Sequence, residues 1–424
     1  IPIALSGAEN SLVLWGDQGG GEILADYGIA YSFMLYVNEK FGGARFMRYW
    51  QNSTKVGIAG FEDALAQFGY QTTFAQVYHD FAVAMAVDYL IDQGVSGPNP
   101  GGRYGLTTLR AQLSFNTTQA YGTPGAPPYG SDYVKVADLA GLSALNFVGA
   151  PNIVRKTPWT SSASGPANWA GGAVLRSGHA NNSEAWLARE VTLGPGTQTL
   201  SFDTYFDIEE CYDYAAVRVS TDGGQTFTSL ANDLTDDCAA DDGQDPRVTA
   251  ILPGFTGQTP AWTRATFDLS DYAGQTIVLA FAYVTDPAAA GNDGSAANNG
   301  LWLDNIAIDD TILSDGSAAS LAAFSDVTAF QPIATAYTVQ IVGYGANTFT
   351  VMQLPLADGK NGALTPAQIA ELAGYEYLVA IVTYDAPTGP DNAGPGPDYA
   401  PYTLTVTRNG ETTTMPGGNL RIGR

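Results

Sequence analysis

Apolar side chains recur every three or four positions in the first hundred residues of the chain. Between Asp26 and Phe41 they fall on one face of a helix, at Ala30, Phe33, Met34, Val37 and Phe41. Gly42-Gly43 follows where such a helix would end. The same spacing predicts a second helix over 61–68 and a third over 74–89. Because three such faces can bury one another, residues 1–105 are predicted to form a helical region that closes in a Gly- and Pro-rich stretch.

The period of the apolar positions changes to two after residue 105, which is typical of β-strands. Two short strands are predicted at 133–136 and 142–148. A run of further strands, separated by turn residues, occupies 198–205, 214–220, 262–269, 276–284 and 301–308. The last hundred residues add strands at 338–343, 348–354, 377–384 and 402–407. The central run, within 157–316, has the pattern of a jelly-roll-like sandwich.

The strands near 133 and 142 pose a problem of domain organisation, because two short strands cannot bury a face by themselves. We therefore expect residues 106–156 to combine with 317–424 in one β-sandwich, with the jelly-roll-like domain 157–316 inserted between them. The predicted fold class is multidomain and mainly β with an α part: an N-terminal helical subdomain, a jelly-roll sandwich and a second sandwich. This organisation requires contacts between residues 127–156 and the last hundred residues.

The net charge of the chain limits the classes of molecule that it can bind. The chain of 424 residues has 42 Asp and Glu against 18 Lys and Arg, for a formal net charge of -24. Such a field repels phosphate backbones, so no nucleic-acid partner is expected, whereas hard cations such as calcium suit convergent carboxylates. The apolar run 27–37 is too short to cross a bilayer, so no membrane span is expected. Because the chain opens with Ile1-Pro2 and no initiator Met, we interpret it as a mature product or a fragment.

Two cysteines, Cys211 and Cys238, lie in one acidic, turn-rich region. An even pair of this kind is the pattern expected of a structural disulfide in an exported protein. The alternative is two unrelated buried thiols.

Several motifs resemble the immune inhibitor A family of secreted zinc metallopeptidases. In the helical region these are Ser11-Leu12 with Trp15, Ala25-Asp26-Tyr27-Gly28 and the helix from Tyr31 to Gly42, which resemble the segment that follows the zinc site. Motifs that resemble the family's jelly-roll domain cover roughly residues 159–310: Phe206-Asp207-Ile208-Glu209, Asp213-Tyr214-Ala215, Val219-Ser220-Thr221-Asp222-Gly223-Gly224, Asp268-Leu269-Ser270-Asp271-Tyr272-Ala273-Gly274 and Gly300-Leu301-Trp302-Leu303-Asp304-Asn305. Their order and spacing carry more weight than any single motif.

The resemblance implies an H-E-x-x-H helix that holds zinc and activates water, and this sequence does not contain one. Its two histidines, His79 and His179, are a hundred residues apart, and neither can be half of that motif. Glu9 is better interpreted as a solvated or capping carboxylate than as a zinc ligand. We therefore expect the carboxy-terminal part of a larger secreted peptidase, inactive alone and without zinc, whose partners are the upstream peptidase region of the same precursor and a protein substrate or the cell surface. The expected location is secreted or on the extracellular surface.

The resemblance also implies a calcium site, because acids at the strand ends of such jelly rolls converge on calcium. The candidate ligands are Glu209, Asp213, Asp286 and Asp304. The alternative is that these are solvated acids in an acidic protein. A second cluster lacks the spacing of a helix-loop-helix calcium loop and favours solvation or loose ion binding: Asp233, Asp236, Asp237, Asp241, Asp242 and Asp245.

Two other functions stay open at this point. One is a noncatalytic extracellular protein, structural, adhesive or self-assembling, whose exposed strand edges would mediate homo-assembly. The other is a carbohydrate-binding module, which would need an exposed platform of aromatic rings. Five tryptophans could build such a platform but suit a sandwich core better: Trp159, Trp169, Trp186, Trp262 and Trp302. Sequons at Asn52, Asn116 and Asn181 have meaning only in a host that glycosylates exported chains.

Overall fold

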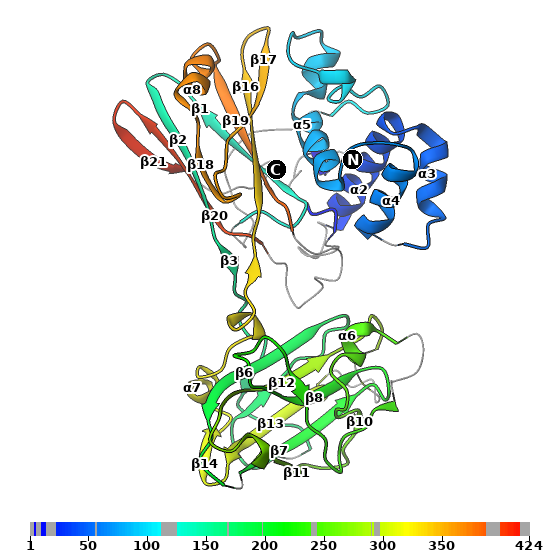
Figure 1. The fold of residues 1–424 in the computed structure, drawn as a ribbon, viewed down its shortest axis with the longest axis vertical. Helices are drawn as coiled ribbons and strands as arrows, with labels where there is room; N and C mark the ends of the chain where they lie inside the picture. Colours follow the sequence, from blue (N-terminus) through cyan, green and yellow to red (C-terminus); the bar gives the residue numbers. More distant parts are fainter. Residues whose placement is uncertain are drawn as a thin grey trace. The chain divides into compact units, whose positions relative to one another are not determined.

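The computed structural model describes residues 4–5, 10–13, 23–55, 57–111, 125–167, 169–196, 198–238, 244–289, 291, 297–386 and 399–415. They divide into two compact units (Figure 1). Unit 1 holds the described residues up to Ile153 and those from Ala334 onward, and unit 2 runs from Val154 to Ile333. In the part of the chain that is described, no helix has both the length and the apolarity needed to cross a membrane.

The helices of unit 1 are α2 (Ile23–Lys40), α3 (Gly43–Gln51), α4 (Gly57–Gln67) and α5 (Phe74–Asp92), followed by the short 3-10 helix η2 (Pro100–Gly102). The Phe33 ring lies at their centre, 5.3 Å from the Phe81 ring and 6.0 Å from the Phe61 ring between centroids. The predicted stop at Gly42-Gly43 is present, since both glycines have positive φ. A further helix, α3, begins directly after it and was not predicted; Phe46 is its one buried residue.

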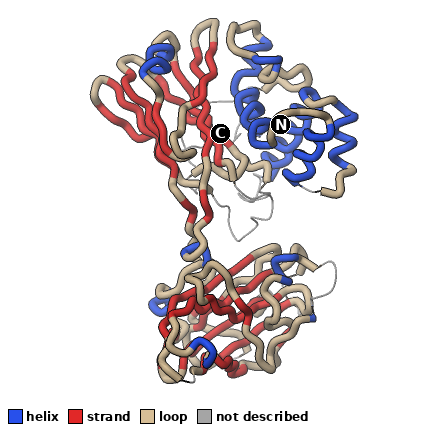
Figure 2. The backbone as a smooth tube through the Cα atoms, in the orientation of Figure 1, coloured by secondary structure: helices blue, strands red, loops and turns tan. Residues whose placement is uncertain are grey.

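Unit 1 also contains two antiparallel four-stranded sheets, and helices α2 to α5 form a region apart from the strands (Figure 2). The first sheet has the order β1-β19-β16-β17, from β1 (Ser131–Ala137), β19 (Tyr377–Tyr384), β16 (Tyr337–Tyr344) and β17 (Phe349–Gln353). The second has the order β18-β2-β20-β21, from β18 (Asn361–Ala363), β2 (Leu142–Gly149), β20 (Tyr402–Arg408) and β21 (Glu411–Met415). Helix α8 (Pro366–Leu372) starts at a capping box on Thr365, and β3 (Asn152–Ile153) pairs with β15 (Ile333–Ala334).

Strands from the two ends of the sequence share these sheets. Tyr133 on β1 lies opposite Ile381 on β19, and Leu145 on β2 lies opposite Val406 on β20. The helices adjoin the first sheet through α5, whose backbone carbonyls at Ala82 and Ala86 accept hydrogen bonds from Tyr133 and Tyr344, each at 3.0 Å. Residues 127–149 therefore pair with the last hundred residues.

Unit 2 is a sandwich of two sheets. The larger has the order β10-β7-β13-β5-β4, with β11 beside β7 and β14 beside β13, and the smaller has the order β6-β12-β8-β9. The strands are β4 (Thr160–Ser162), β5 (Val174–Arg176), β6 (Glu184–Thr192), β7 (Thr199–Ile208), β8 (Tyr214–Ser220), β9 (Thr228–Ser229), β10 (Gly257–Gln258), β11 (Thr263–Asp268), β12 (Thr276–Val284), β13 (Gly300–Ile308) and β14 (Thr311–Ser314). Short helices α6 (Pro246–Thr249), η4 (Ser270–Tyr272), α7 (Ala318–Leu321) and η5 (Val327–Ala329) lie in its connections. Buried rings from both sheets, among them Phe202 and Phe281, form the core. The predicted fold class is confirmed.

The end of the central domain lies later than the sequence predicted. Phe324 is buried in the core of unit 2, and Ser325 exchanges two backbone hydrogen bonds of 2.8 Å with Ala188 on β6. Residues 317–333 therefore belong to unit 2 and not to the second sandwich, because their apolar side chains complete the jelly-roll core.

Candidate metal centre

The pairing of β8 with β12 brings two of the predicted ligands together. Tyr214, the first residue of β8, lies opposite Val284, the last residue of β12. Asp213 precedes β8 and Asp286 follows β12, so both lie at the same end of adjacent antiparallel strands. The backbone N–H of Asp286 donates a hydrogen bond of 2.7 Å to Oδ1 of Asp213.

Glu209 reaches the same place through the short connection between β7 and β8. The carbonyl of Glu209 accepts hydrogen bonds from the Asp213 N–H at 3.1 Å and from the Thr256 hydroxyl at 3.1 Å. Cys211, at the turn, has a positive φ of 64° and donates its N–H to the Thr256 hydroxyl at 2.8 Å. A disulfide joins Cys211 to Cys238, with the two Cα atoms 5.4 Å apart. The connection is thus held from two sides. Thr256 is a residue that the sequence did not signal, because it is 45 positions from Cys211.

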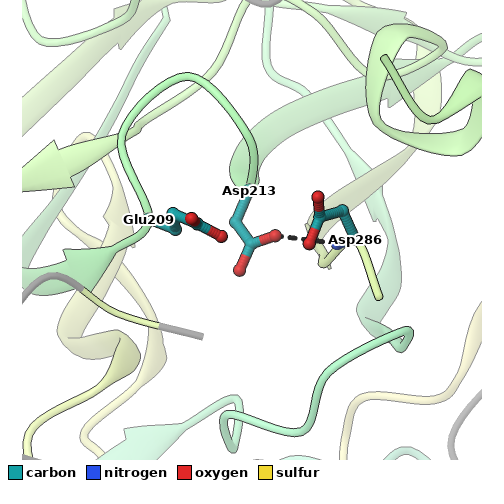
Figure 3. A group of neighbouring side chains, drawn as sticks. All are labelled: Glu209, Asp213 and Asp286. Atoms are coloured by element: carbon teal, nitrogen blue, oxygen red, sulfur yellow. Dashed lines mark hydrogen bonds between the residues drawn. The ribbon is translucent and has the colours of Figure 1, made fainter. Parts of the chain in front are cut away.

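The three carboxylates converge (Figure 3). One oxygen from each of Glu209, Asp213 and Asp286 lies within 4.8 Å of the others. Asp213 has no exposed surface, and the other two residues are half-buried. Oδ2 of Asp213 and Oε2 of Glu209 are buried and have no hydrogen-bond partner among the described residues. Buried carboxylate oxygens without a donor point to a cation as their partner.

The electrostatics of the cluster agree with that geometry. Burial, together with the neighbouring charges of Asp286, Glu209 and Asp245, raises the pKa of Asp213 to about 8, although the hydrogen bond from the Asp286 N–H lowers it. Burial and then the charge of Asp286 raise the pKa of Glu209. The Tyr283 hydroxyl, also buried without a partner among the described residues, has its pKa raised by burial and by the Asp213 charge. These acids repel one another, so a bound cation would stabilise the ionised cluster.

The donor set fits calcium. Calcium takes six to eight oxygen ligands in irregular geometry, and carboxylates are its usual protein ligands. Glu209, Asp213 and Asp286 would supply oxygen from three places in the chain, with backbone carbonyls and water completing the shell. The described part of the cluster offers neither imidazole nor thiolate, the ligands that zinc prefers.

Asp304, the fourth predicted ligand, does not belong to this cluster. The start of β13 adjoins the site, where Gly300 lies opposite Asp207, whereas Asp304 is four residues further along and lies opposite Asp203. Four strand residues span about 13 Å. The Asp304 carboxylate instead accepts the Asn305 N–H at 2.7 Å, and burial and the nearby Asp203 charge raise its pKa. The assignment of Asp304 was wrong because the sequence placed it nearer the strand end than it is.

The other candidate residues lie apart from the cluster. His79, on α5 in unit 1, lies 2.6 Å from Asp385 through its Nε2, and His179 in unit 2 lies 2.7 Å from the Arg176 guanidinium through its Nδ1. Burial and the Arg176 charge lower the pKa of His179. In the second acidic cluster, Asp245 caps α6 and pairs with Arg247 at 2.6 Å. Glu9, Asn116, Asp241 and Asp242 lie outside the described residues.

The tryptophans of unit 2 pack against other side chains. Trp159 and Trp186 are buried, and Trp302 is buried beneath the Arg176 guanidinium, 4.8 Å from its ring centroid. Trp169 and Trp262 stack on each other with centroids 4.2 Å apart, each half-buried. These five rings therefore serve packing in the structure, as their sequence context favoured.

Comparison with known proteins places the cluster in a recognised domain. Residues 150–326 match the family model described as "Immune inhibitor A-like, MAM domain". Two curated relatives, both named pre-pro-metalloprotease PrtV, come from Vibrio cholerae serotype O1 strains M66-2 and ATCC 39315 (El Tor Inaba N16961). Each is 33% identical over 147 residues, which cover 34% of this chain and 14% of the relative. The matched segment is thus a small part of these relatives' length.

Among solved structures, that of TmCBM61 in complex with β-1,4-galactotriose is similar to part of the chain. It has a TM-score of 0.21 and 14% identity, covering 37% of this chain and 93% of that chain. A likeness of this size carries no inference about a ligand. The resemblance predicted from the sequence motifs is confirmed: the chain resembles the C-terminal region of an immune inhibitor A-like metallopeptidase.

Proposed function

We propose that this chain is the noncatalytic C-terminal portion of a secreted, zinc-dependent metallopeptidase of the immune inhibitor A type, and that its jelly-roll domain is stabilised by calcium. The sequence contains no H-E-x-x-H motif, so peptide hydrolysis belongs to polypeptide outside these residues. The chain acts as a scaffold for the peptidase region and as the part of the protein that interacts with a protein substrate or the cell surface.

One observation carries the calcium part of the proposal. Three carboxylates from two strand ends and a disulfide-tethered turn meet in the matched domain, and two of their buried oxygens have no donor among the described residues. A calcium ion at this point would tie the β7–β8 turn to the end of β12. The disulfide suits an oxidising, extracellular location.

The experiment has two parts. Thermal unfolding of the homogeneous chain is recorded with calcium, with magnesium and with a chelator, because an ion bound only by the folded state must raise the midpoint. A calcium-specific rise supports the site, and identical midpoints contradict it. Incubation of the same preparation with an unfolded protein substrate tests the noncatalytic role, which sustained cleavage by this chain would overturn.

A further inference from the structure

Four buried side-chain oxygens in the described part of unit 2 have no hydrogen-bond partner. Two of them are the carboxylate oxygens of Asp213 and Glu209 discussed above. The other two are the hydroxyl of Tyr283, which has no exposed surface, and Oδ1 of Asn299, which is 7% exposed. Because a buried polar atom without a partner is costly, four of them in one unit indicate that a partner is bound there.

The four residues lie at one end of the sandwich. β7 leads into β8 through residues 209–213, so the end of β7 and the start of β8 are neighbours. Gly300, the first residue of β13, lies opposite Asp207 near the end of β7. Val284, the last residue of β12, lies opposite Tyr214, the first residue of β8. Since β7 and β13 belong to the larger sheet and β8 and β12 to the smaller one, both sheets contribute to this end.

The Tyr283 hydroxyl is near the carboxylate of Asp213. Tyr283 lies opposite Ala215, and both side chains are in the core between the two sheets. Asp213 is two positions before Ala215 and therefore points to the same side, as a diagonal neighbour within reach of an aromatic side chain. Burial raises the pKa of the Tyr283 hydroxyl, and the charge of Asp213 is the next largest cause, which agrees with this placement.

Asn299 adjoins the turn that carries Glu209. It directly precedes Gly300, which lies opposite Asp207, and Glu209 is two residues after Asp207. The backbone is fixed at this point, because Gly300 has a φ of 95° and a Cβ there would collide with the Gly178 carbonyl. The amide of Asn299 is thus held, buried, beside the carboxylates.

We propose that Oδ1 of Asn299 is a fourth side-chain ligand of the calcium ion held by the three carboxylates of Figure 3, an inference that rests on the proposed function. Amide carbonyls are ordinary calcium ligands. Asn299 replaces Asp304, the ligand expected from the sequence, and lies next to β13 at the strand end that adjoins the site. The ion then draws ligands from the ends of strands in both sheets and links the two sheets of the sandwich.

A neutral fourth ligand favours calcium over magnesium. Three carboxylates already repel one another, and an amide oxygen adds a ligand without adding negative charge. Calcium accepts six to eight oxygens in irregular geometry, whereas magnesium requires a near-ideal octahedron and keeps several of its waters. A buried water molecule would also give the four oxygens a partner, but it would leave the charge of the acids uncompensated.

Calcium titration calorimetry of the whole chain tests the assignment. Asn299→Ala should lower the calcium affinity by about tenfold or more, because the oxygen is lost. Asn299→Asp keeps an oxygen at this position and should bind calcium at least as tightly as the wild type. Asn298→Ala is the matched control and should keep the wild-type affinity, since the Asn298 backbone carbonyl still accepts the Trp302 indole N–H at 3.0 Å.

The outcomes separate this inference from the proposed function. If the wild-type chain binds no calcium, the calcium part of the proposed function and the inference both fail. If the wild type binds calcium and Asn299→Ala binds it equally well, the calcium site stands, Asn299 is not a ligand, and water is the partner of its amide oxygen. A loss of affinity in Asn298→Ala equal to that in Asn299→Ala also overturns the assignment.

Two further measurements exclude a purely structural role of Asn299. In chelator, Asn299→Ala should unfold at or above the wild-type midpoint, because it removes a buried oxygen without a partner. A lower midpoint in chelator would show that Asn299 stabilises unit 2 without the ion, and the inference fails. In a crystal structure of the calcium-loaded wild-type chain, Oδ1 of Asn299 should lie about 2.3–2.6 Å from the ion, and an ion bound by the carboxylates without Asn299 overturns the assignment.

Discussion

The backbone N–H of Asp286 donates a 2.7 Å hydrogen bond to Oδ1 of Asp213, and the other oxygen of that buried carboxylate has no donor among the described residues. This hydrogen bond joins the end of β12 to the start of β8. Oδ2 of Asp213 is left for another partner. Removing that capacity without changing the shape of the side chain is the most direct test of the site.

Asp213→Asn should abolish the rise in unfolding midpoint that calcium gives the wild-type chain, because the amide lacks the charge that the cation needs. Without calcium, the variant should unfold at or above the wild-type midpoint at neutral pH and above, since a buried group that resists ionisation is gone. Thermal unfolding with and without calcium measures both effects. Asp310→Asn, in an exposed turn, is the matched control and should keep the full calcium response. A calcium response in Asp213→Asn equal to that of the wild type would remove Asp213 from the site.

Replacing Cys211 and Cys238 together by serine should destabilise unit 2. In the chain-entropy model, a crosslink over a separation of 27 residues stabilises the folded state by about 3–4 kcal/mol. The turn that carries Glu209 also becomes freer to move, so calcium affinity should fall. Urea unfolding and calcium titration of the double variant measure the two effects. Unchanged unfolding would show that the disulfide constrains little of the unfolded chain.

The helices and most strands were predictable because their apolar periods are local. The helix expected over 26–41 is α2, Ile23–Lys40, and the strand expected over 276–284 is β12 with the same bounds. Helix α3 was missed, and Phe46 is its one buried residue. The end of the inserted domain was missed because Ser325 pairs with Ala188, a contact over 137 positions that leaves no local pattern.

The candidate site was predictable as far as strand ends could be placed. Glu209 and Asp213 flank one short turn, and Asp286 follows a clear strand, so their convergence needs only antiparallel pairing of β8 with β12. The prediction that Asp304 joins the cluster failed because the position of Asp304 depends on the register between β13 and β7. That register is set by packing of the whole sheet, which no single strand sequence specifies.

Stability of unit 1 should fall as the pH rises from about 4 to about 7, because of Asp132. The ordinary pKa of an aspartate is 3.8, and burial raises the pKa of this carboxyl to about 7. A hydrogen bond from the Tyr402 hydroxyl acts in the opposite direction and lowers the pKa. Between these values the folded state holds a proton that the unfolded state has released, so the free energy of unfolding decreases from about pH 4 to about pH 7 and then levels off.

Asp132→Asn should remove this pH dependence, since the amide oxygen still accepts from Tyr402. The variant should match the wild type near pH 4 and exceed its stability above pH 7 by about 2–4 kcal/mol. Tyr402→Phe should extend the decline to higher pH, because the hydrogen bond that lowers the pKa of Asp132 is lost. Urea unfolding across this pH range is the measurement, and parallel curves for wild type and Asp132→Asn would contradict the assignment.

Each unit has its own core, so core truncations should act on one unit at a time. Phe281→Ala, in the core of unit 2, should destabilise that unit by about 3–5 kcal/mol, and Phe81→Ala should do the same to unit 1. Differential scanning calorimetry would then show which part of the unfolding profile moves. If both variants shift the whole profile equally, the two units unfold as one.

His79 fixes α5 to the first sheet through Asp385, which follows β19. The two side chains are 2.6 Å apart, and the other Asp385 oxygen accepts the Thr338 hydroxyl at 2.8 Å, so the carboxylate joins the helix to two strand ends. His79→Ala leaves this mostly buried carboxylate with one donor fewer, and the stability of unit 1 should fall by about 1–3 kcal/mol. His79→Gln, which can restore a donor, should recover part of the loss, and His179→Ala in unit 2 should leave unit 1 unaffected. Hydrogen exchange of the α5 amides measures the change locally, and unaltered protection in His79→Ala would mean that apolar packing alone holds the helix in place.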